Sequence, residues 1–217
     1  MKTFGELVEG YHIPVLNERE IRAAAGIMFL ATFISLMLII NSGNFVPIKY
    51  VIIVFLIDFS IRLFINPKYA PVLILGRFMV SNQNPEYVGA KQKKFAWYIG
   101  LFLAAAMFIL MVVFNTYSII TGLVCLICLI LMFFESAFGI CIGCKMYSLF
   151  YKEKAQYCPG EICDVKTKHD IQKINLKQVS ITFLFIAFIF LITFLFSSHL
   201  FDQPVDLFKA NTINSTH

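Results

Sequence analysis

Cysteine is the residue type whose placement in this sequence most clearly suggests chemistry. All six cysteines occur in close pairs, which are Cys125 with Cys128, Cys141 with Cys144, and Cys158 with Cys163. The first pair lies in a run of Leu and Ile, where a cysteine packs like a small hydrophobic residue. The other two pairs lie beside Gly, Pro and Lys in segments expected to face the cytoplasm, and thiols in that setting favour redox or metal chemistry over permanent disulfides.

The second cysteine pair has two interpretations. If Cys141 and Cys144 close a helix, the negative end of the helix dipole disfavours the thiolate that redox chemistry needs. Lys145 favours the thiolate, and Gly139 and Gly143 can break the helix so that a new one begins near the cysteines. In the alternative, the glycines let another helix pack closely and the cysteines are structural.

Two further hypotheses join the second and third pairs. In a thiol relay, Cys141 and Cys144 exchange disulfides or carry a sulfane sulfur, and Cys158 and Cys163 pass the equivalents onward. In a metal site, the loop between the pairs brings the four thiolates together around zinc or iron. The C-x4-C spacing is looser than that of common zinc knuckles, so we favour the relay.

Three ionisable residues lie inside apolar stretches. Asp58 and Arg62 are four residues apart, which puts them on one helix face within reach of an ion pair. An unpaired carboxylate at Glu135 would be costly in a membrane, so it must be protonated, paired with a cation or exposed to a wet cavity. We predict one intramembrane network of Asp58, Arg62 and Glu135; a direct part in transport or chemistry is the alternative.

The composition places these residues in a membrane protein. Of 217 residues, 59% are hydrophobic and 14% are charged, and the mean hydropathy is +0.78. Apolar stretches of about 20 residues predict an all-α bundle of five transmembrane helices in one membrane domain. A shorter apolar run at 71–80, which contains Arg77, predicts an interfacial helix or, alternatively, a re-entrant one. The five predicted spans are residues 21–40, 46–65, 95–114, 119–151 and 179–198, of which the fourth emerges from the membrane near its end.

Sixteen of the eighteen Lys and Arg residues fall in the N-terminal tail with the first turn, the stretch 62–94 and the stretch 145–177, which all lie on the same predicted side of the membrane. This bias predicts a cytoplasmic N-terminus and an external C-terminus. The segments are then a cytoplasmic tail (1–20), a four-span core (21–151), a cytoplasmic Cys-containing loop (152–178), a fifth transmembrane helix (179–198) and an external tail (199–217). Trp97 and Tyr98 fall near the predicted cytoplasmic interface, as residues of an aromatic belt do.

Three runs of sequence resemble a family of small bacterial integral membrane proteins of unknown function. The runs are IPVLNEREIRAAAG (13–26), LIDFSIRLF (56–64) and ESAFGICIGCKMY (135–147). The resemblance implies about four spans in a bacterial cytoplasmic (inner) membrane, and it implies no established reaction. It singles out Asn17, Glu18, Arg19, Asp58, Arg62, Glu135, Gly139, Cys141, Gly143 and Cys144. The chain departs from the family pattern beyond Tyr151, where it adds a CPGEIC run and the fifth span.

These observations favour an integral membrane protein that handles thiols, disulfides or persulfide sulfur at the cytoplasmic face. Its expected partners are the lipid bilayer and, as the resemblance implies, a cytoplasmic thioredoxin-like or sulfurtransferase protein. The alternative is a non-enzymatic transporter, channel or assembly protein with structural cysteines. No nucleotide-binding loop or Ser, His, Asp arrangement supports a hydrolase or ATPase, and no nucleic-acid partner is expected because the basic residues flank apolar runs. No cofactor is expected apart from the zinc or iron hypothesis.

Overall fold

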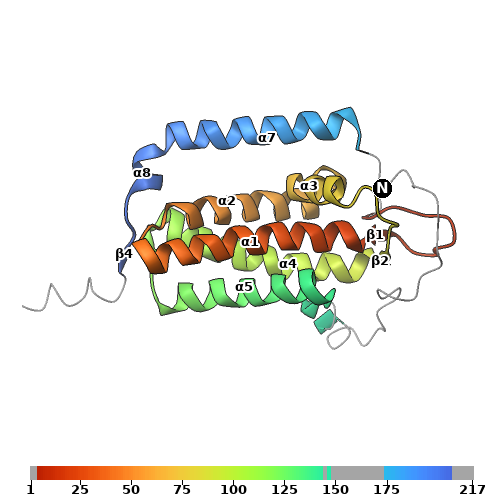
Figure 1. The fold of residues 1–217 in the computed structure, drawn as a ribbon, viewed down its shortest axis with the longest axis horizontal. Coiled ribbons are helices and arrows are strands. Elements are labelled where there is room, and N and C mark those ends of the chain that lie inside the picture. Colours follow the sequence, from red (N-terminus) through yellow and green to blue (C-terminus); the bar gives the residue numbers. More distant parts are fainter. Residues whose placement is uncertain (1–3, 144–145, 148–173, 207–217) are drawn as a thin grey trace, which may run out of the picture.

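The computed structural model describes residues 4–143, 146–147 and 174–206. Long helices lie side by side along the longest axis, and a further long helix follows the bundle along one side (Figure 1). Strands form only ladders of two or three residues in the described ranges, so the predicted all-α class is confirmed. The elements are β1 (Val15–Asn17), α1 (Glu18–Ser42), α2 (Val46–Ser60), η1 (Ile61–Ile65), η2 (Pro67–Tyr69), α3 (Pro71–Met79), β2 (Tyr87–Gly89), α4 (Ala90–Met107), η3 (Phe108–Val113), β3 (Thr116–Tyr117), α5 (Ile119–Phe138), α7 (Leu176–Leu195), α8 (Ser197–Phe201) and β4 (Val205–Asp206).

Four described helical segments are long and apolar enough to cross a membrane, which makes this an integral membrane protein. They are Glu18–Ser42, Ala90–Val113, Ile119–Phe138 and Leu176–Leu195. The other predicted span, 46–65, is divided into α2 with 15 residues and the π-helix η1 with 5. Each part alone is shorter than a hydrocarbon core requires, so the count of five spans stays a prediction.

A small ladder brings the starts of two long helices together. Strand β1 runs directly into α1, strand β2 runs directly into α4, and the two strands pair antiparallel, with Asn17 opposite Tyr87. The Asn17 side-chain oxygen accepts a hydrogen bond from the backbone N–H of Arg19 at 3.2 Å, which caps α1. Helix α4 therefore begins at Ala90 and not at the predicted residue 95, because the lysine-rich turn after β2 is already helical.

Helix α5 ends earlier than the predicted fourth span. Gly139 adopts a left-handed conformation (φ 66°), and its backbone N–H donates to the carbonyl of Glu135 at 3.1 Å. The next amide, of Ile140, reaches the carbonyl of Phe134 at 3.1 Å, which is the paired hydrogen bonding that ends many helices. The prediction of one continuous helix to residue 151 is therefore wrong, and Cys141 follows a break.

Helix α3 packs tightly against α1, and its arginine is not at the surface. At Gly76 a Cβ atom would lie 2.6 Å from the backbone oxygen of Glu20, so only glycine permits this approach. Arg77 is buried and forms two 3.0 Å hydrogen bonds with the Glu20 carboxylate. The argument that Arg77 holds this helix in the membrane interface is therefore wrong, because its charge is neutralised inside the protein.

Helix α7 is attached to the rest of the molecule near its two ends. At one end Gln178 donates to the backbone carbonyl of Lys68 at 3.1 Å, and near the other the Tyr50 hydroxyl lies 3.0 Å from that of Thr193. Beyond α8, Lys49 Nζ donates to the carbonyl of Asp202 at 2.6 Å. Only 6% of the apolar window of α7 is buried, so most of its surface is available to lipid.

Candidate functional site

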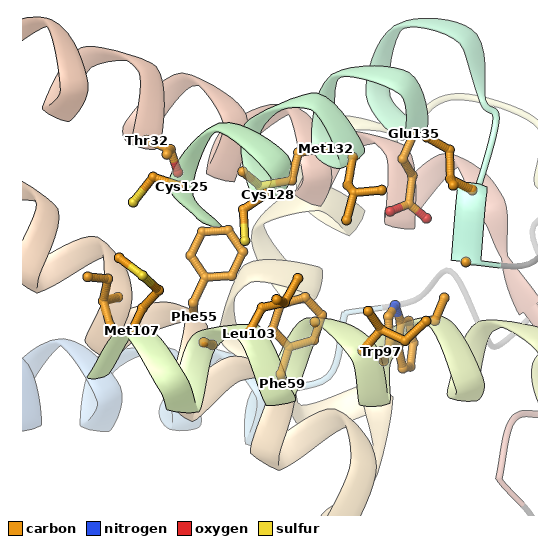
Figure 2. A pocket seen from close by; sticks show the side chains of 18 of the residues that line it. Thr32, Phe55, Phe59, Trp97, Leu103, Met107, Cys125, Cys128, Met132 and Glu135 are labelled. Atoms are coloured by element: carbon orange, nitrogen blue, oxygen red, sulfur yellow. The ribbon is translucent and has the colours of Figure 1, made fainter. Parts of the chain in front are cut away.

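A cavity of about 130 Å³ lies among α2, α4 and α5. Figure 2 shows Cys125, Cys128, Met132 and Glu135 projecting from one side of it toward residues of the facing helix, α4. The segment after the helix break completes the wall with residues 141–143 and Met146. Apart from Glu135, the described lining residues carry no charged side chain, so the cavity is an apolar space with one acidic end.

The α5 side of the cavity is a single helix face. Cys125, Cys128, Met132 and Glu135 follow one another at intervals of three, four and three residues, which aligns them along the helix. Cys125 is also part of the buried core that includes Met107, and Cys128 packs against a second core cluster. Packing is the role predicted for this pair, and the structure adds that both free thiols line the cavity.

A lysine joins two carboxylates at the acidic end of the cavity. Lys93 Nζ lies 2.7 Å from Glu18 Oε2 and 2.8 Å from Glu135 Oε1, so the group links α1, α4 and α5. Glu18 and Lys93 are fully buried, whereas the Glu135 side chain is 20% exposed. One ammonium between two carboxylates leaves one negative charge in excess, which a proton or another cation can neutralise.

Asp58 and Arg62 form the predicted ion pair within one helical segment. Arg62 Nη2 lies 2.5 Å from Asp58 Oδ2. The other carboxylate oxygen, Oδ1, accepts a 2.8 Å hydrogen bond from the backbone N–H of Val72. Asp58 thereby caps the first turn of α3, whose own N-cap residue, Ala70, has no side-chain acceptor.

The predicted single network of Asp58, Arg62 and Glu135 is wrong. Glu135 reaches Lys93, and the described contacts of Arg62 lead elsewhere. The Arg62 guanidinium lies 4.9 Å from the ring centroid of Phe59 and 5.1 Å from that of Trp97. Asp58, Arg62 and Glu135 therefore belong to two separate ion groups where the sequence suggested one.

Trp97 belongs to the interior and not to an aromatic belt. It is 3% exposed, while the neighbouring Tyr98 is 46% exposed. The Trp97 ring contacts Phe4 edge-on at 5.8 Å and lines the cavity. The belt prediction therefore fails for Trp97, because the helix face that carries Lys93 turns it inward.

Sequence reasoning missed Lys93, which it counted only as a topology signal. Among the buried positions of the α4–η3 segment, residues 93, 97, 104, 107 and 111 follow helical spacing and form one inward stripe. Extending this helical spacing back through Trp97 identifies Lys93 as inward-facing, so the signal was present. The reasoning also missed Glu20 with Arg77 and Glu86 with Arg19, whose ion pairs measure 3.0 and 2.7 Å.

The resemblance singled out Asn17, Glu18 and Arg19 without roles, and all three have partners at this end of the bundle. Asn17 caps α1, Glu18 binds Lys93, and Arg19 binds Glu86. Two residues of the third run that carries the resemblance also lie at the cavity. Cys141 lines it, and Gly143 approaches α4 so closely that a Cβ atom at position 143 would lie 2.6 Å from the Ala96 Cβ. Gly143 is thus a site of close helix packing, as the structural alternative required.

The remaining cysteine predictions lie outside the described residues, since Cys144, Cys158 and Cys163 are not among them. Within residues 4–143, 146–147 and 174–206, no group of three or more His, Cys, Asp or Glu side chains is arranged to hold a metal ion. Zinc or iron binding by the four cysteines therefore stays a prediction.

Comparison with known families matches residues 16–152 to the domain of unknown function DUF4395. The match contains α1 to α5, the cavity and both ion groups, and it ends before α7. No curated protein and no solved structure matches the chain. Because the match covers well over half of the 217 residues, the chain belongs to the DUF4395 family.

Proposed function

We propose that this protein handles thiols, disulfides or persulfide sulfur, and that the reacting cysteine is Cys141, with Cys144 as its neighbour in sequence. The observation that carries the proposal is that Cys141 lines the same cavity as Glu135, the carboxylate held by Lys93. A thiol must lose its proton before it attacks, and a carboxylate at the same cavity is a group that can accept that proton. The chemistry would thus face the cavity and not only the cytoplasmic surface.

The step is a sulfur-to-sulfur displacement. In disulfide exchange, the Cys141 thiolate attacks one sulfur of a disulfide, a new sulfur–sulfur bond forms, the old one breaks, and the leaving thiolate takes a proton. In persulfide transfer, the thiolate takes the terminal sulfur of a donor persulfide and the donor leaves as a thiol. A cytoplasmic thioredoxin-like or sulfurtransferase protein would supply the disulfide or the persulfide, and Cys158 and Cys163 would pass the equivalents onward.

Per-residue thiol labelling of the full chain in membranes tests the proposal. We expect N-ethylmaleimide to modify Cys141 or Cys144 well before the buried Cys125, and a polysulfide donor to add sulfur to the same residue. Glu135→Gln should shift the pH dependence of Cys141 labelling. The matched control is Glu86→Gln, which removes a carboxylate of the Arg19 pair away from the cavity and should leave that pH dependence unchanged. Resistance of both Cys141 and Cys144 to alkylation and to polysulfide would refute the proposal.

A non-enzymatic transporter, channel or assembly role is the second candidate, and the buried Glu18, Lys93 and Glu135 group favours it. Ionisable groups inside membrane helices commonly mark proton or ion pathways. In this case Glu135→Gln should change proton or ion flux in proteoliposomes, while replacing Cys141 by Ser should leave the flux unchanged. Under the thiol proposal, the order is reversed in a sulfur-transfer assay: replacing Cys141 by Ser should have the larger effect and Glu135→Gln the smaller one.

We further propose five spans in the bacterial cytoplasmic membrane, with the N-terminus inside and the C-terminus outside. Helix α2 is followed directly by η1, so residues 46–65 form one helical segment of the length a span needs. Reporter fusions at Lys94, Lys166 and His217 test the arrangement. We expect the first two to report the cytoplasm and the third the exterior, and a cytoplasmic signal at His217 would remove the fifth span.

A further inference from the structure

The only tryptophan of the chain, Trp97, has an unused hydrogen-bond donor beside the cavity. Its Nε1–H is buried, and no acceptor for it lies among the described residues. In Figure 2 the indole nitrogen lies on the side of the ring that faces Glu135 and the α5 wall. A buried donor without an acceptor is costly, so this position favours a ligand that brings an acceptor atom.

The other lining residues limit what that ligand can be. Phe55, Phe59 and Leu103 present apolar surface, and Glu135 would repel an anion. A volume of about 130 Å³ is close to that of apolar cavities that hold a single six-membered ring. The ligand class is therefore a neutral ring with an oxygen acceptor.

The cavity is also reachable from the sides of the helices. Leu103 on α4 and Cys128 and Leu131 on α5 line it and are only half-buried. These residues lie in the middle of segments that are apolar enough to cross a membrane, so the surrounding medium at that depth is hydrocarbon. A ligand dissolved in the bilayer can therefore approach the cavity from the side of the bundle.

We propose that the cavity binds a membrane-soluble, carbonyl-bearing ring of the quinone type, with one carbonyl oxygen accepting a hydrogen bond from Trp97 Nε1–H. The ring packs against Phe55 and Phe59, and any substituents extend through the half-buried side toward lipid. This inference goes beyond the proposed thiol chemistry and does not depend on it, because no cysteine is needed for the binding.

Fluorescence of the single tryptophan provides a direct test, since its emission comes only from Trp97. Duroquinone is a suitable probe because all its ring carbons are substituted, so thiols do not add to it. We expect saturable quenching of the purified full chain in nanodiscs. Durene has the same carbon skeleton, a six-membered ring with four methyl groups, but no carbonyls. We expect it to displace duroquinone with about tenfold lower affinity, which corresponds to the loss of one good hydrogen bond.

Two variants and a matched control locate the site. Trp97→Phe keeps an aromatic ring but removes the N–H, so equilibrium dialysis should show duroquinone binding about tenfold more weakly. Leu103→Phe keeps Trp97 as the probe and fills the cavity, so quenching should be lost while the emission maximum stays that of a buried indole. Phe102→Leu on the same helix is the control, because Phe102 is 73% exposed and does not line the cavity.

The outcomes separate the alternatives. Equal affinity for duroquinone and durene would mean that water satisfies the Trp97 N–H. Quenching that does not saturate, and that Leu103→Phe does not change, would mean that duroquinone only partitions into lipid. Either result overturns the inference. Labelling of Cys141 in the same preparations reports on the thiol proposal independently, so one hypothesis can fail while the other stands.

Discussion

At the end of the bundle that carries α3 and the β1–β2 ladder, the buried cations Arg62, Arg77 and Lys93 each contact a carboxylate. At the opposite end, where α8 lies, the buried Lys49 donates instead to the backbone carbonyls of Leu200 and Asp202, at 3.5 and 2.6 Å (Figure 1). The first end thus contains three buried charge pairs, of which Arg77–Glu20 and Lys93–Glu18 join different helices. The second is held by contacts between a side chain and the main chain.

The difference predicts how each end responds to the loss of one group. Removing one partner of a buried charge pair leaves the other charge without compensation in a medium of low polarity, which is strongly destabilising. Removing a lysine from backbone carbonyls leaves neutral acceptors, and these cost less to bury. The charge-pair end should therefore be the end that is more sensitive to the loss of one group.

Lys93→Met should have the largest effect. It leaves the fully buried Glu18 and its neighbour Glu135 without their shared cation, so we expect the free energy of unfolding in detergent to fall by about 3–5 kcal/mol. Lys91→Met is the matched control, because Lys91 is exposed on the same helix and should change stability by about 0.5 kcal/mol or less. Equal stability of the two variants would show that the pairing at Lys93 contributes nothing.

The Asp58 and Arg62 pair gives the second-largest effect. Either Asp58→Asn or Arg62→Met alone should cost about 3 kcal/mol, because each leaves one buried charge, and the double variant should be more stable than the sum of the two losses implies. Asn at 58 retains an oxygen that can accept from the Val72 N–H, so Asp58→Ala should cost about 1 kcal/mol more. Chemical denaturation of the four variants measures both effects, and strictly additive losses would rule out the pairing.

Much of this arrangement follows from the sequence, and the exceptions have physical causes. The apolar stretches located the long helices, and the i, i+4 spacing predicted the Asp58–Arg62 pair. Local spacing does not say which charge on another helix lies nearby, so the partner of Glu135 was assigned to the wrong helix. Lys93 was read as an interfacial charge because the β1–β2 ladder, which positions it beside Glu18, consists of three residues per strand and has no distinct sequence pattern.

Lys49→Met tests the opposite end and should have a smaller effect. We expect a loss of about 1–2 kcal/mol, confined to the attachment of α8, because the two carbonyls lose a donor but no buried charge is left unpaired. Hydrogen exchange should accelerate in residues 197–206 and stay unchanged in α3. The control Tyr50→Phe removes only the hydroxyl contact with Thr193 and should cost about 1 kcal/mol or less. A loss as large as that of Lys93→Met would remove the distinction between the ends.

The last comparison uses two glycines, Gly139 directly after α5 and Gly122 inside it, which lie near opposite ends of the bundle. Gly139→Ala places a Cβ in a left-handed conformation at the charge-pair end and brings it 3.2 Å from the Arg22 guanidinium, so we expect a loss of about 1–2 kcal/mol. Gly122 lies inside α5 near the opposite end, with no atom within 4 Å of the Cβ position, so Gly122→Ala should stabilise the protein by about 0.5–1 kcal/mol. Thermal unfolding of the two variants should therefore shift in opposite directions. If both shift the same way, the left-handed turn at Gly139 does not set the end of α5, and Cys141 would not be turned toward the cavity by that break.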